Sequence, residues 1–245
     1  STAMAATKVV CHHLGRVPYL RAQAMQRRLV AMRRAQEISD HILLLEHPPV
    51  FTLGRMQASL QNLRVSESEV AAAGASIVQS DRGGNVTFHG PGQLVAYPIL
   101  DLHGHKRNVR WYVSSLEEAL IETAATFGLQ ARAGDDGETG VWVEDRKLAA
   151  IGVSVKRWVT SHGIALNSNV DLNYFNMIVP CGLHAHPRVT SLSKELTRDV
   201  DVSEAAPVFI SSLASTMRCD IVKASETDKH EMQRIAQLAD ADLHS

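Results

Sequence analysis

The sequence has little net charge, few cysteines and no long apolar run. Its 25 lysines and arginines nearly balance 26 aspartates and glutamates. A general nucleic-acid binder would be strongly basic, so that class is disfavoured. Three cysteines are too few for a disulfide framework, and an odd number favours a reducing compartment. No window approaches 18 consecutive apolar residues, and no segment resembles a secretory signal. We therefore expect a soluble intracellular protein.

The composition is that of a globular chain. Hydrophobic residues make up 45% of the 245 positions and charged residues 21%, which excludes a disordered or collagen-like chain. A chain of this length can bury a core without disulfide bridges. We expect an N-terminal segment over 1–13 that precedes the domain. Within it, Ser1–Ala3 is interpreted as residues left from cloning, followed by a native Met4. A catalytic domain over 14–222 and a polar tail over 223–245 follow.

Helices and strands are predicted from apolar periodicity and from capping residues. The predicted helices cover 18–37, 66–74, 108–128 and 203–217. The predicted strands cover 42–45, 50–53, 75–80, 93–100, 141–144, 148–155, 162–167 and 221–222. The helices stand between clusters of strands rather than after every strand. This order favours a single α+β domain with a mixed sheet over a doubly wound parallel sheet.

A glycine-rich segment, Arg82-Gly83-Gly84-Asn85-Val86-Thr87-Phe88-His89-Gly90-Pro91-Gly92-Gln93, is the first candidate site. Glycines allow a ligand to approach bare backbone, whose N–H groups can bind a carbonyl or a phosphate. The segment is neither a Walker loop nor a convincing dinucleotide fingerprint. Two ordinary hairpin turns explain the glycines equally well, but Arg82 and His89 on either side favour a binding loop.

Cys181 is the candidate nucleophile, because Pro180 and Gly182 place it on a constrained loop with little steric cover. Cys11 and Cys219 lie in apolar stretches and are predicted to be core residues. A thiol needs a proton acceptor, which one of the 12 histidines or Lys147 would supply. Lys147 precedes an apolar run that would lower its pKa if the side chain were buried there, although these residues alone favour an exposed hairpin lysine.

Two further patterns remain open at this stage. Cys181, His184 and His186 have the chemistry of zinc ligands but lack a regularly spaced fourth one, so we predict no metal. The first helix has a basic face, which is either solvated or a docking surface for an acidic partner. That face consists of Arg21, Arg27, Arg28, Arg33 and Arg34.

Four motifs in order resemble those of the lipoyl(octanoyl) transferases. They are the glycine-rich segment, Gly140–Val143 with Lys147–Gly152, Ser161–Asn167, and Pro180-Cys181-Gly182 with Thr190-Ser191-Leu192. The similarity runs from about residue 14 to residue 220. It implies the mixed-sheet fold of biotin protein ligases and lipoate ligases. It also implies transfer of an octanoyl or lipoyl group from acyl carrier protein to a lysine of a lipoyl domain, without a cofactor.

The resemblance also implies roles for individual residues. Cys181 would form the acyl-enzyme thioester, and Lys147 would lower the pKa of its thiol. Backbone N–H groups near Gly182 or Gly83-Gly84 would hold the oxyanion. The expected substrate-binding residues are Arg82, Gly83, Gly84, Asn85, Val86, Thr87, Phe88, His89, Ala150, Ile151, Gly152, His162, Gly163, Ile164 and Ala165.

The implied partners are octanoyl-acyl carrier protein as donor, and lipoyl domains of 2-oxoacid dehydrogenase complexes or glycine cleavage H protein as acceptors. We expect no nucleic acid or membrane partner, and a monomer by default. The compartment would be the cytoplasm in a bacterium, and the mitochondrial matrix or a plastid in a eukaryote. Two alternatives stay open: an ATP-dependent lipoate–protein ligase, which does not need the cysteine, and a non-catalytic octanoyl- or lipoyl-binding protein.

Overall fold

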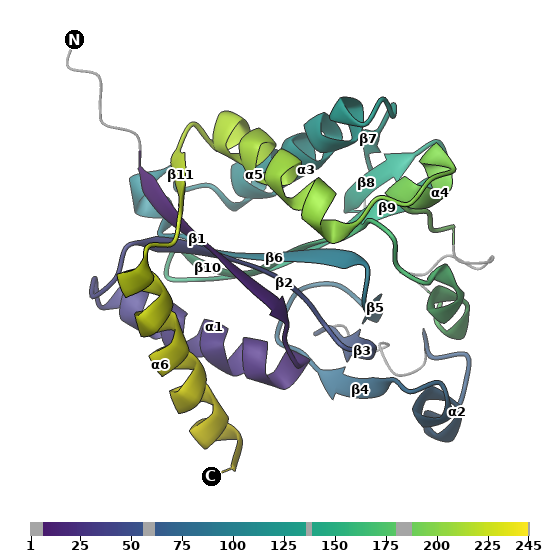
Figure 1. Cartoon of the computed structure of the whole chain (residues 1–245), viewed down its shortest axis with the longest axis horizontal. Coiled ribbons are helices and arrows are strands. Elements are labelled where there is room, and N and C mark those ends of the chain that lie inside the picture. The colour runs from purple at the N-terminus through teal and green to yellow at the C-terminus, as the bar shows by residue number, and fades with distance from the viewer. Residues whose placement is uncertain (1–6, 56–61, 136–138, 180–187, 245) are drawn as a thin grey trace.

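The computed structural model describes residues 7–55, 62–135, 139–179 and 188–244. Cys181, His184 and His186 therefore lie outside the described residues. Figure 1 shows the arrangement of the elements. The strands are β1 (Lys8–Arg16), β2 (Asp40–Glu46), β3 (Val50–Leu53), β4 (Ser76–Gln79), β5 (Thr87–His89), β6 (Gln93–Ile99), β7 (Arg132–Ala133), β8 (Gly140–Val143), β9 (Arg146–Lys156), β10 (Val159–Asn167) and β11 (Asp220–Lys223). The α-helices are α1 (Tyr19–Arg34), α2 (Glu67–Ala72), α3 (Val109–Thr126), α4 (Leu192–Leu196), α5 (Val202–Met217) and α6 (Glu226–His244).

An eight-stranded mixed sheet forms the centre of the molecule, in the order β11-β1-β2-β6-β10-β9-β8-β7. The three strands β11, β1 and β2 run parallel, and every later neighbour pairs antiparallel. A second sheet, β4-β3-β5, lies beside it. Helices do not alternate with strands, so the predicted α+β class with a mixed sheet is confirmed.

Helices α3 and α5 cover one face of the large sheet (Figure 1). The α3 stripe predicted from the sequence includes Leu116 and Leu120, and both side chains are fully buried. They pack with Phe209 and Leu213 of α5 and with Leu94 of β6. Packing of these regularly spaced apolar side chains against the sheet explains why apolar periodicity located both helices.

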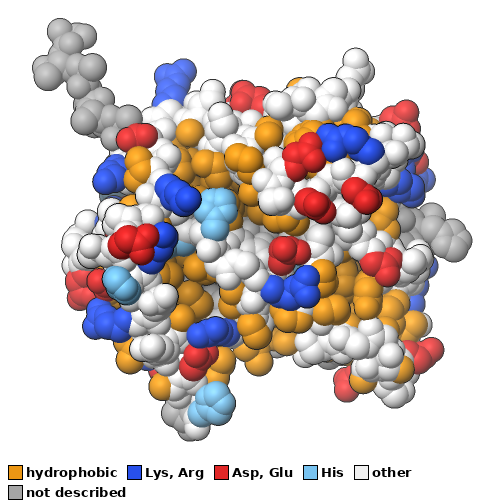
Figure 2. All heavy atoms as spheres, viewed as in Figure 1, with side chains coloured by type: hydrophobic (Ala, Val, Ile, Leu, Met, Phe, Trp, Pro, Cys, Tyr) orange, Lys and Arg blue, Asp and Glu red, His pale blue; other side chains and the backbone are white. Residues whose placement is uncertain are grey.

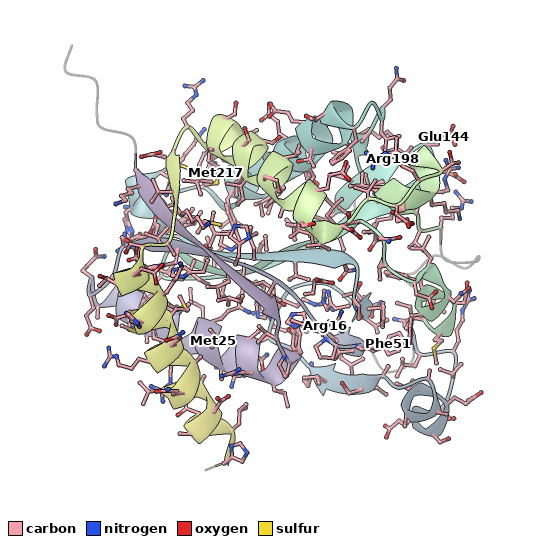
Figure 3. The ribbon with its side chains drawn as sticks, viewed as in Figure 1. Arg16, Met25, Phe51, Glu144, Arg198 and Met217 are labelled. Carbon is pink, nitrogen blue, oxygen red and sulfur yellow. The ribbon has the colours of Figure 1, made fainter. Side chains whose placement is uncertain are left out.

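Helices α1 and α6 cover the opposite face. Met232, Ile235 and Ala239 of α6 recur at helical spacing and pack with Met25 and Leu29 of α1. Figure 3 shows Met25 on this side of the sheet and Met217 on the α5 side. The polar tail predicted over 223–245 therefore contains a packed helix, α6. The predicted limits of the catalytic domain stay a prediction, although β1 and α6 extend the packed structure beyond 14–222.

The basic face of α1 is largely engaged within the chain. Arg21 contacts Asp240 of α6 at 2.9 Å, and Arg28 contacts Asp242 at 2.6 Å. Arg33 contacts the buried carboxylate of Asp40 at 2.7 Å. Two of the five arginines, Arg27 and Arg34, remain candidates for contact with an acidic partner.

The surface agrees with the near-zero net charge. Figure 2 shows positive and negative side chains interspersed over the face seen in Figure 1, rather than gathered by sign.

Cys11 and Cys219 are buried, as predicted, and burial raises the pKa of their thiols to about 12 and about 11. In the described part of the chain no helix is long and apolar enough to cross a membrane.

Candidate active site

One pocket is lined by three of the motif segments identified in the sequence. It is open to solvent and has a cavity volume of about 90 Å³. The glycine-rich segment contributes residues 82–87 and 89, β9 contributes Lys147 and 150–152, and β10 contributes 162–165. These segments are far apart in sequence, and pairing of β9 with β10 places 150–152 opposite 163–165. The lining combines glycine backbone and apolar side chains, which suit an acyl chain, with polar side chains such as Asn85, His89 and Gln93.

Phe88 is the expected substrate-binding residue that does not line this pocket. Its ring is buried in the small sheet, where it stacks on Tyr174 at 4.4 Å between centroids and contacts Phe51 at 5.1 Å. Figure 3 shows Phe51 in this region of the molecule. Alternation along β5 directs Phe88 into the core beneath the loop, so Phe88 supports the pocket from behind.

Gly163 is required by close packing at the pocket wall. A Cβ at this position would lie 2.1 Å from the Ala96 carbonyl oxygen of β6 and 2.7 Å from Pro98 Cδ. Neither contact can relax without moving the strand. Glycine therefore lets β10 approach β6 closely and leaves backbone exposed toward the ligand space.

Arg82 holds the glycine-rich segment against β3. Its guanidinium donates to the Thr52 carbonyl oxygen at 2.7 Å, to Thr52 Oγ1 at 2.8 Å and to the Gly83 carbonyl oxygen at 2.9 Å. The side chain is 7% exposed. Its charge is thus used to fix the loop. The Gly83 N–H, expected as an oxyanion donor, instead donates to the Val153 carbonyl oxygen at 3.2 Å, and Gly182 lies outside the described residues.

A chain of hydrogen bonds connects the motifs beneath the pocket. His89 Nδ1 donates to Gln93 Oε1 at 2.7 Å, Gln93 Nε2 donates to Asn167 Oδ1 at 2.9 Å, and Asn167 Nδ2 donates to the Thr190 carbonyl oxygen at 2.9 Å. The Thr190 N–H then donates to the Lys147 carbonyl oxygen at 3.0 Å. Burial lowers the pKa of His89 well below its usual value, so the ring is neutral. These hydrogen bonds therefore hold the glycine-rich segment, the Ser161–Asn167 motif and the Thr190-Ser191-Leu192 motif in place relative to Lys147.

A second buried polar group lies deeper. His47 Nδ1 donates to the Val17 carbonyl oxygen at 2.6 Å, and the Tyr97 hydroxyl donates to His47 Nε2 at 2.8 Å. Burial lowers the pKa of His47 to about 4 and raises that of Tyr97. The Tyr19 ring stacks with that of His89 at 6.0 Å. This end of the pocket consists of neutral hydrogen-bonding groups.

Lys147 lies in β9, not in the turn, and is half-buried. A β-bulge opposite Val141 and Trp142 changes the register at this point, and such bulges redirect side chains. The Lys147 Nζ lies 4.8 Å from the Trp142 ring centroid and 3.2 Å from the Thr139 carbonyl oxygen. A ring face and a carbonyl oxygen both interact favourably with an ammonium group. The sequence left an exposed hairpin lysine open, and the side chain instead reaches the pocket.

The chain on both sides of 180–187 is held by backbone hydrogen bonds. The Val179 N–H donates to the Asn62 carbonyl oxygen at 2.7 Å. On the other side, the Lys147 N–H donates to the Arg188 carbonyl oxygen at 2.7 Å, and residue 189 pairs with Lys147. The residues that follow the Cys181 segment are therefore fixed beside Lys147.

His162 forms the wall of the pocket nearest to α1. Its Nε2 donates to Asp81 Oδ1 at 2.8 Å, and its backbone N–H donates to Gln26 Oε1 at 2.7 Å. The backbone φ of 56° is in the left-handed region, an uncommon conformation for a histidine. The His162 hydrogen bond is the main reason why the pKa of Asp81 is lowered, and Lys156 contributes.

Seven pocket residues had no role assigned from the sequence. Gln93 and Asn167 belong to the family motifs and Val189 adjoins one, so their place in the sequence could have indicated a role in the site. Thr139 likewise adjoins the motif Gly140–Val143, whereas the three aromatic residues had no comparable pattern. The seven are Tyr19, Gln93, Tyr97, Thr139, Asn167, Phe175 and Val189. Among the described residues, no group of three or more His, Cys, Asp or Glu side chains is arranged to hold a metal ion.

Comparison with known proteins identifies the class of this fold and site. The family described as Lipoyl protein ligase A/B catalytic domain matches residues 18–214. Crystallised lipoate-protein ligase A bound with ATP superposes with a TM-score of 0.73 at 14% identity, covering 95% of this chain and 94% of that one. A biotin protein ligase of Aquifex aeolicus gives a TM-score of 0.50 at 12% identity, covering 85% of this chain and 70% of that one. The predicted fold is confirmed, and these likenesses concern the fold alone.

Relatives of much higher identity define the family within this class. The mitochondrial octanoyl-acyl-carrier-protein:protein N-octanoyltransferase LIPT2 of Danio rerio is 44% identical over 223 residues, covering 90% of this chain and 96% of the relative. The octanoyltransferase of the bacterium Solibacter usitatus is 52% identical over 174 residues, covering 69% of this chain and 76% of the relative. This chain belongs to the octanoyltransferase family, as the motifs predicted.

Proposed function

We propose that the protein transfers an octanoyl group from octanoyl-acyl carrier protein to a lysine of a protein acceptor, through a thioester on Cys181. Membership of the octanoyltransferase family supports the reaction. The observation that carries the assignment of the site is that three sequence motifs line one pocket and are hydrogen-bonded to the strand segment at Lys147. That arrangement provides an acyl pocket next to an amine base.

Lys147 is the proposed base. Its amine takes the proton of the Cys181 thiol, and the thiolate attacks the carrier thioester. Collapse of the tetrahedral intermediate expels the carrier thiolate, which takes the proton back from Lys147. The acceptor lysine then attacks the acyl-enzyme, forming the amide and releasing the Cys181 thiolate. Lys147 passes the proton of that amine to the thiolate. The Trp142 ring and the Thr139 carbonyl oxygen stabilise the ammonium form that arises in each half-reaction.

The substrate-binding roles of residues 82–89, 150–152 and 162–165 belong to the same proposal. The glycine backbone of residues 83–84 and the apolar side chains within 150–152 and 163–165 fit an eight-carbon chain, in which each buried methylene contributes about 0.8 kcal/mol. Phe88 would act from behind the pocket. We further propose lipoyl domains of 2-oxoacid dehydrogenase complexes and glycine cleavage H protein as acceptors. The relatives include a mitochondrial and a bacterial protein. The proposed compartment is accordingly the mitochondrial matrix or a plastid in a eukaryote and the cytoplasm in a bacterium.

Intact-mass measurement tests the proposed nucleophile. After incubation with octanoyl-acyl carrier protein and no acceptor, the protein should gain one octanoyl group, and Cys181→Ala should gain none. Cys219→Ala is the matched control and should still be acylated at Cys181. The Cys219 thiol itself should not react, because burial raises its pKa to about 11 and keeps it protonated. An adduct that persists in Cys181→Ala contradicts the assignment. If a lipoyl-domain acceptor were octanoylated only in the presence of free octanoate and ATP, the protein would instead be a ligase. Saturable binding of the octanoyl group without any adduct would indicate a binding protein.

A further inference from the structure

A second cavity lies between α1, α6 and the two strands β1 and β11 at one end of the large sheet. It is open to solvent and has a volume of about 450 Å³, within the range of small-molecule sites. In the described part of the chain, this cavity and the acyl pocket share no lining residue. The elements β1, β11 and α6 also lie outside residues 18–214, which the family model matches. The reaction proposed above does not use this cavity.

The floor of the cavity is apolar. Met25 of α1 and Met232 of α6 line it, are 2% and 4% exposed, and belong to the cluster that joins these helices. The lining residues of α6 recur every three or four positions from Lys229 to Ala236, so a single face of the helix forms this wall. Figure 2 shows hydrophobic side chains at the surface between α6 and β1. Methionine side chains adapt to an irregular apolar ligand.

The rim of the cavity is positively charged. Lys223 of β11 and Lys229 of α6 are exposed there, and Arg21 lines the cavity from α1. Among the described residues, no aspartate or glutamate belongs to the lining. Asp240 and Glu226 pair with Arg21 and Lys229 from outside it. The charge that faces a ligand is therefore positive.

Lys223 is the cation of this rim that can pair with a ligand. It forms no ion pair within the ranges that the structure describes. Burial lowers the pKa of His13, and the charge of Lys223 adds to this effect, so the ammonium group lies close to that ring. Since His13 also lines the cavity, an anion at this position would meet Lys223 without displacing an existing ion pair.

An apolar floor below a cationic rim selects an amphiphilic anion. A small anion would gain only a screened attraction at an exposed rim. A neutral apolar molecule would gain only burial, and a cation would be repelled. A phosphate monoester carries more negative charge at neutral pH than one lysine balances. An alkyl chain that ends in a single carboxylate uses both the floor and the rim.

We propose that this cavity binds a free fatty acid as its carboxylate. The alkyl chain lies against Met25, Met232 and Ala236, and the carboxylate pairs with Lys223. Such a ligand contacts both α6 and the strands at this end of the sheet, so it stabilises the packing of α6. The inference does not rest on the proposed acyl transfer.

Isothermal titration calorimetry of the full chain, below the micelle-forming concentration of each ligand, tests the proposal. Ala236→Phe places a ring in the cavity and should remove one molar equivalent of bound decanoate. For that equivalent, affinity should rise about fourfold with each added methylene from octanoate to decanoate, which corresponds to about 0.8 kcal/mol. Decyltrimethylammonium, with the opposite charge, should bind there at least about tenfold more weakly than decanoate. Decyl phosphate should bind no more tightly than decanoate.

A charge variant tests the rim separately. Lys223→Gln, at an exposed position, should weaken binding of the same equivalent about fivefold, the ratio expected for an ion pair at the surface. Lys8→Gln, at an exposed position of the adjacent strand β1, is the matched control and should bind decanoate like the parent protein.

The proposal is wrong if folded Ala236→Phe retains every equivalent of decanoate, or if Lys223→Gln binds decanoate like Lys8→Gln. Equal affinity for decanoate and decyltrimethylammonium would also overturn it, and tighter binding of decyl phosphate would overturn the carboxylate assignment. If Ala236→Phe does not fold, the comparison of Lys223→Gln with Lys8→Gln decides. None of these outcomes bears on acylation of Cys181, which the mass experiment measures separately.

Discussion

Both faces of the large sheet bury apolar side chains, but only the face toward α1 adds the histidine network described above. Under α3 and α5 the cluster is apolar, with Leu116, Leu120 and Phe209 fully buried. Toward α1, the same strands direct Tyr97 and Gln93 to His47 and His89. Apolar packing stabilises the fold without directional requirements. A buried polar network stabilises it only while each group keeps its partner. Apolar packing on both faces therefore stabilises the domain, and the face toward α1 also positions the polar groups of the pocket.

Removal of Lys147 should have the largest effect on activity and little effect on stability. A positioned general base contributes about 100- to 10,000-fold, so Lys147→Ala should lower kcat/KM by that factor. The rate of Cys181 alkylation by iodoacetamide at neutral pH should fall as well. Lys106→Ala, at an exposed position, is the control. An unchanged pH–rate profile for alkylation would contradict the role of Lys147 and remove the proposed division between the two faces.

Leu120→Ala should produce the opposite pattern. Truncation of a fully buried leucine should lower the free energy of unfolding by about 2–5 kcal/mol, through lost burial and a residual cavity. The kcat/KM of the folded fraction should not change. Urea denaturation and initial rates provide the two measurements. Leu120→Met nearly conserves volume, so it should cost less than about 1.5 kcal/mol. A large activity loss in folded Leu120→Ala would show that the faces are coupled.

Acid should destabilise the polar face specifically. The folded pKa of His47 is about 4 because of burial, whereas the unfolded value is about 6.5. The unfolded state binds more protons between these values, so this contribution is present above pH 6.5 and is lost as the pH falls through 4. At about 1.4 kcal/mol for each pKa unit, the total is about 3 kcal/mol. His89 and His12, whose pKa values are also lowered mainly by burial, act in the same direction.

Urea denaturation between pH 7 and pH 4 measures this dependence. His47→Gln should flatten it, although the variant itself is less stable, because glutamine does not titrate. His230→Gln, at an exposed position of α6, should keep the full slope. Equal slopes in the two variants would contradict the assignment to His47.

The ion pair between α1 and α6 should matter least. Arg28 and Asp242 are at hydrogen-bond distance but are 32% and 49% exposed, and exposed pairs contribute about 0–1 kcal/mol. Arg28→Gln and Asp242→Asn should each change the free energy of unfolding by less than about 1 kcal/mol. A double-mutant cycle in low and high salt measures the coupling. A coupling above 2 kcal/mol would mean that surface charge, and not the apolar α6 stripe, holds this layer.

The sequence predicted the apolar face in detail and the polar face only through its motifs. Leu116 and Leu120 recur at helical spacing because packing alone determines them. Tyr19, His47 and Tyr97 follow no period, because their positions depend on partners far apart in the chain. Sequence patterns also did not reveal that Phe88 faces the core, or that Arg21 and Arg28 contact acids of α6. Those facts depend on register and on a helix beyond residue 225.

The ends of the large sheet determine how the protein meets other chains. The two edge strands are β11, with four residues, and β7, with two. An extended segment of another molecule would find few unpaired backbone groups at either edge. Such short edges protect a mixed sheet against edge-to-edge aggregation. A protein that binds at either end of the large sheet would therefore be recognised through side chains and surface shape, and such contacts can change without altering the sheet.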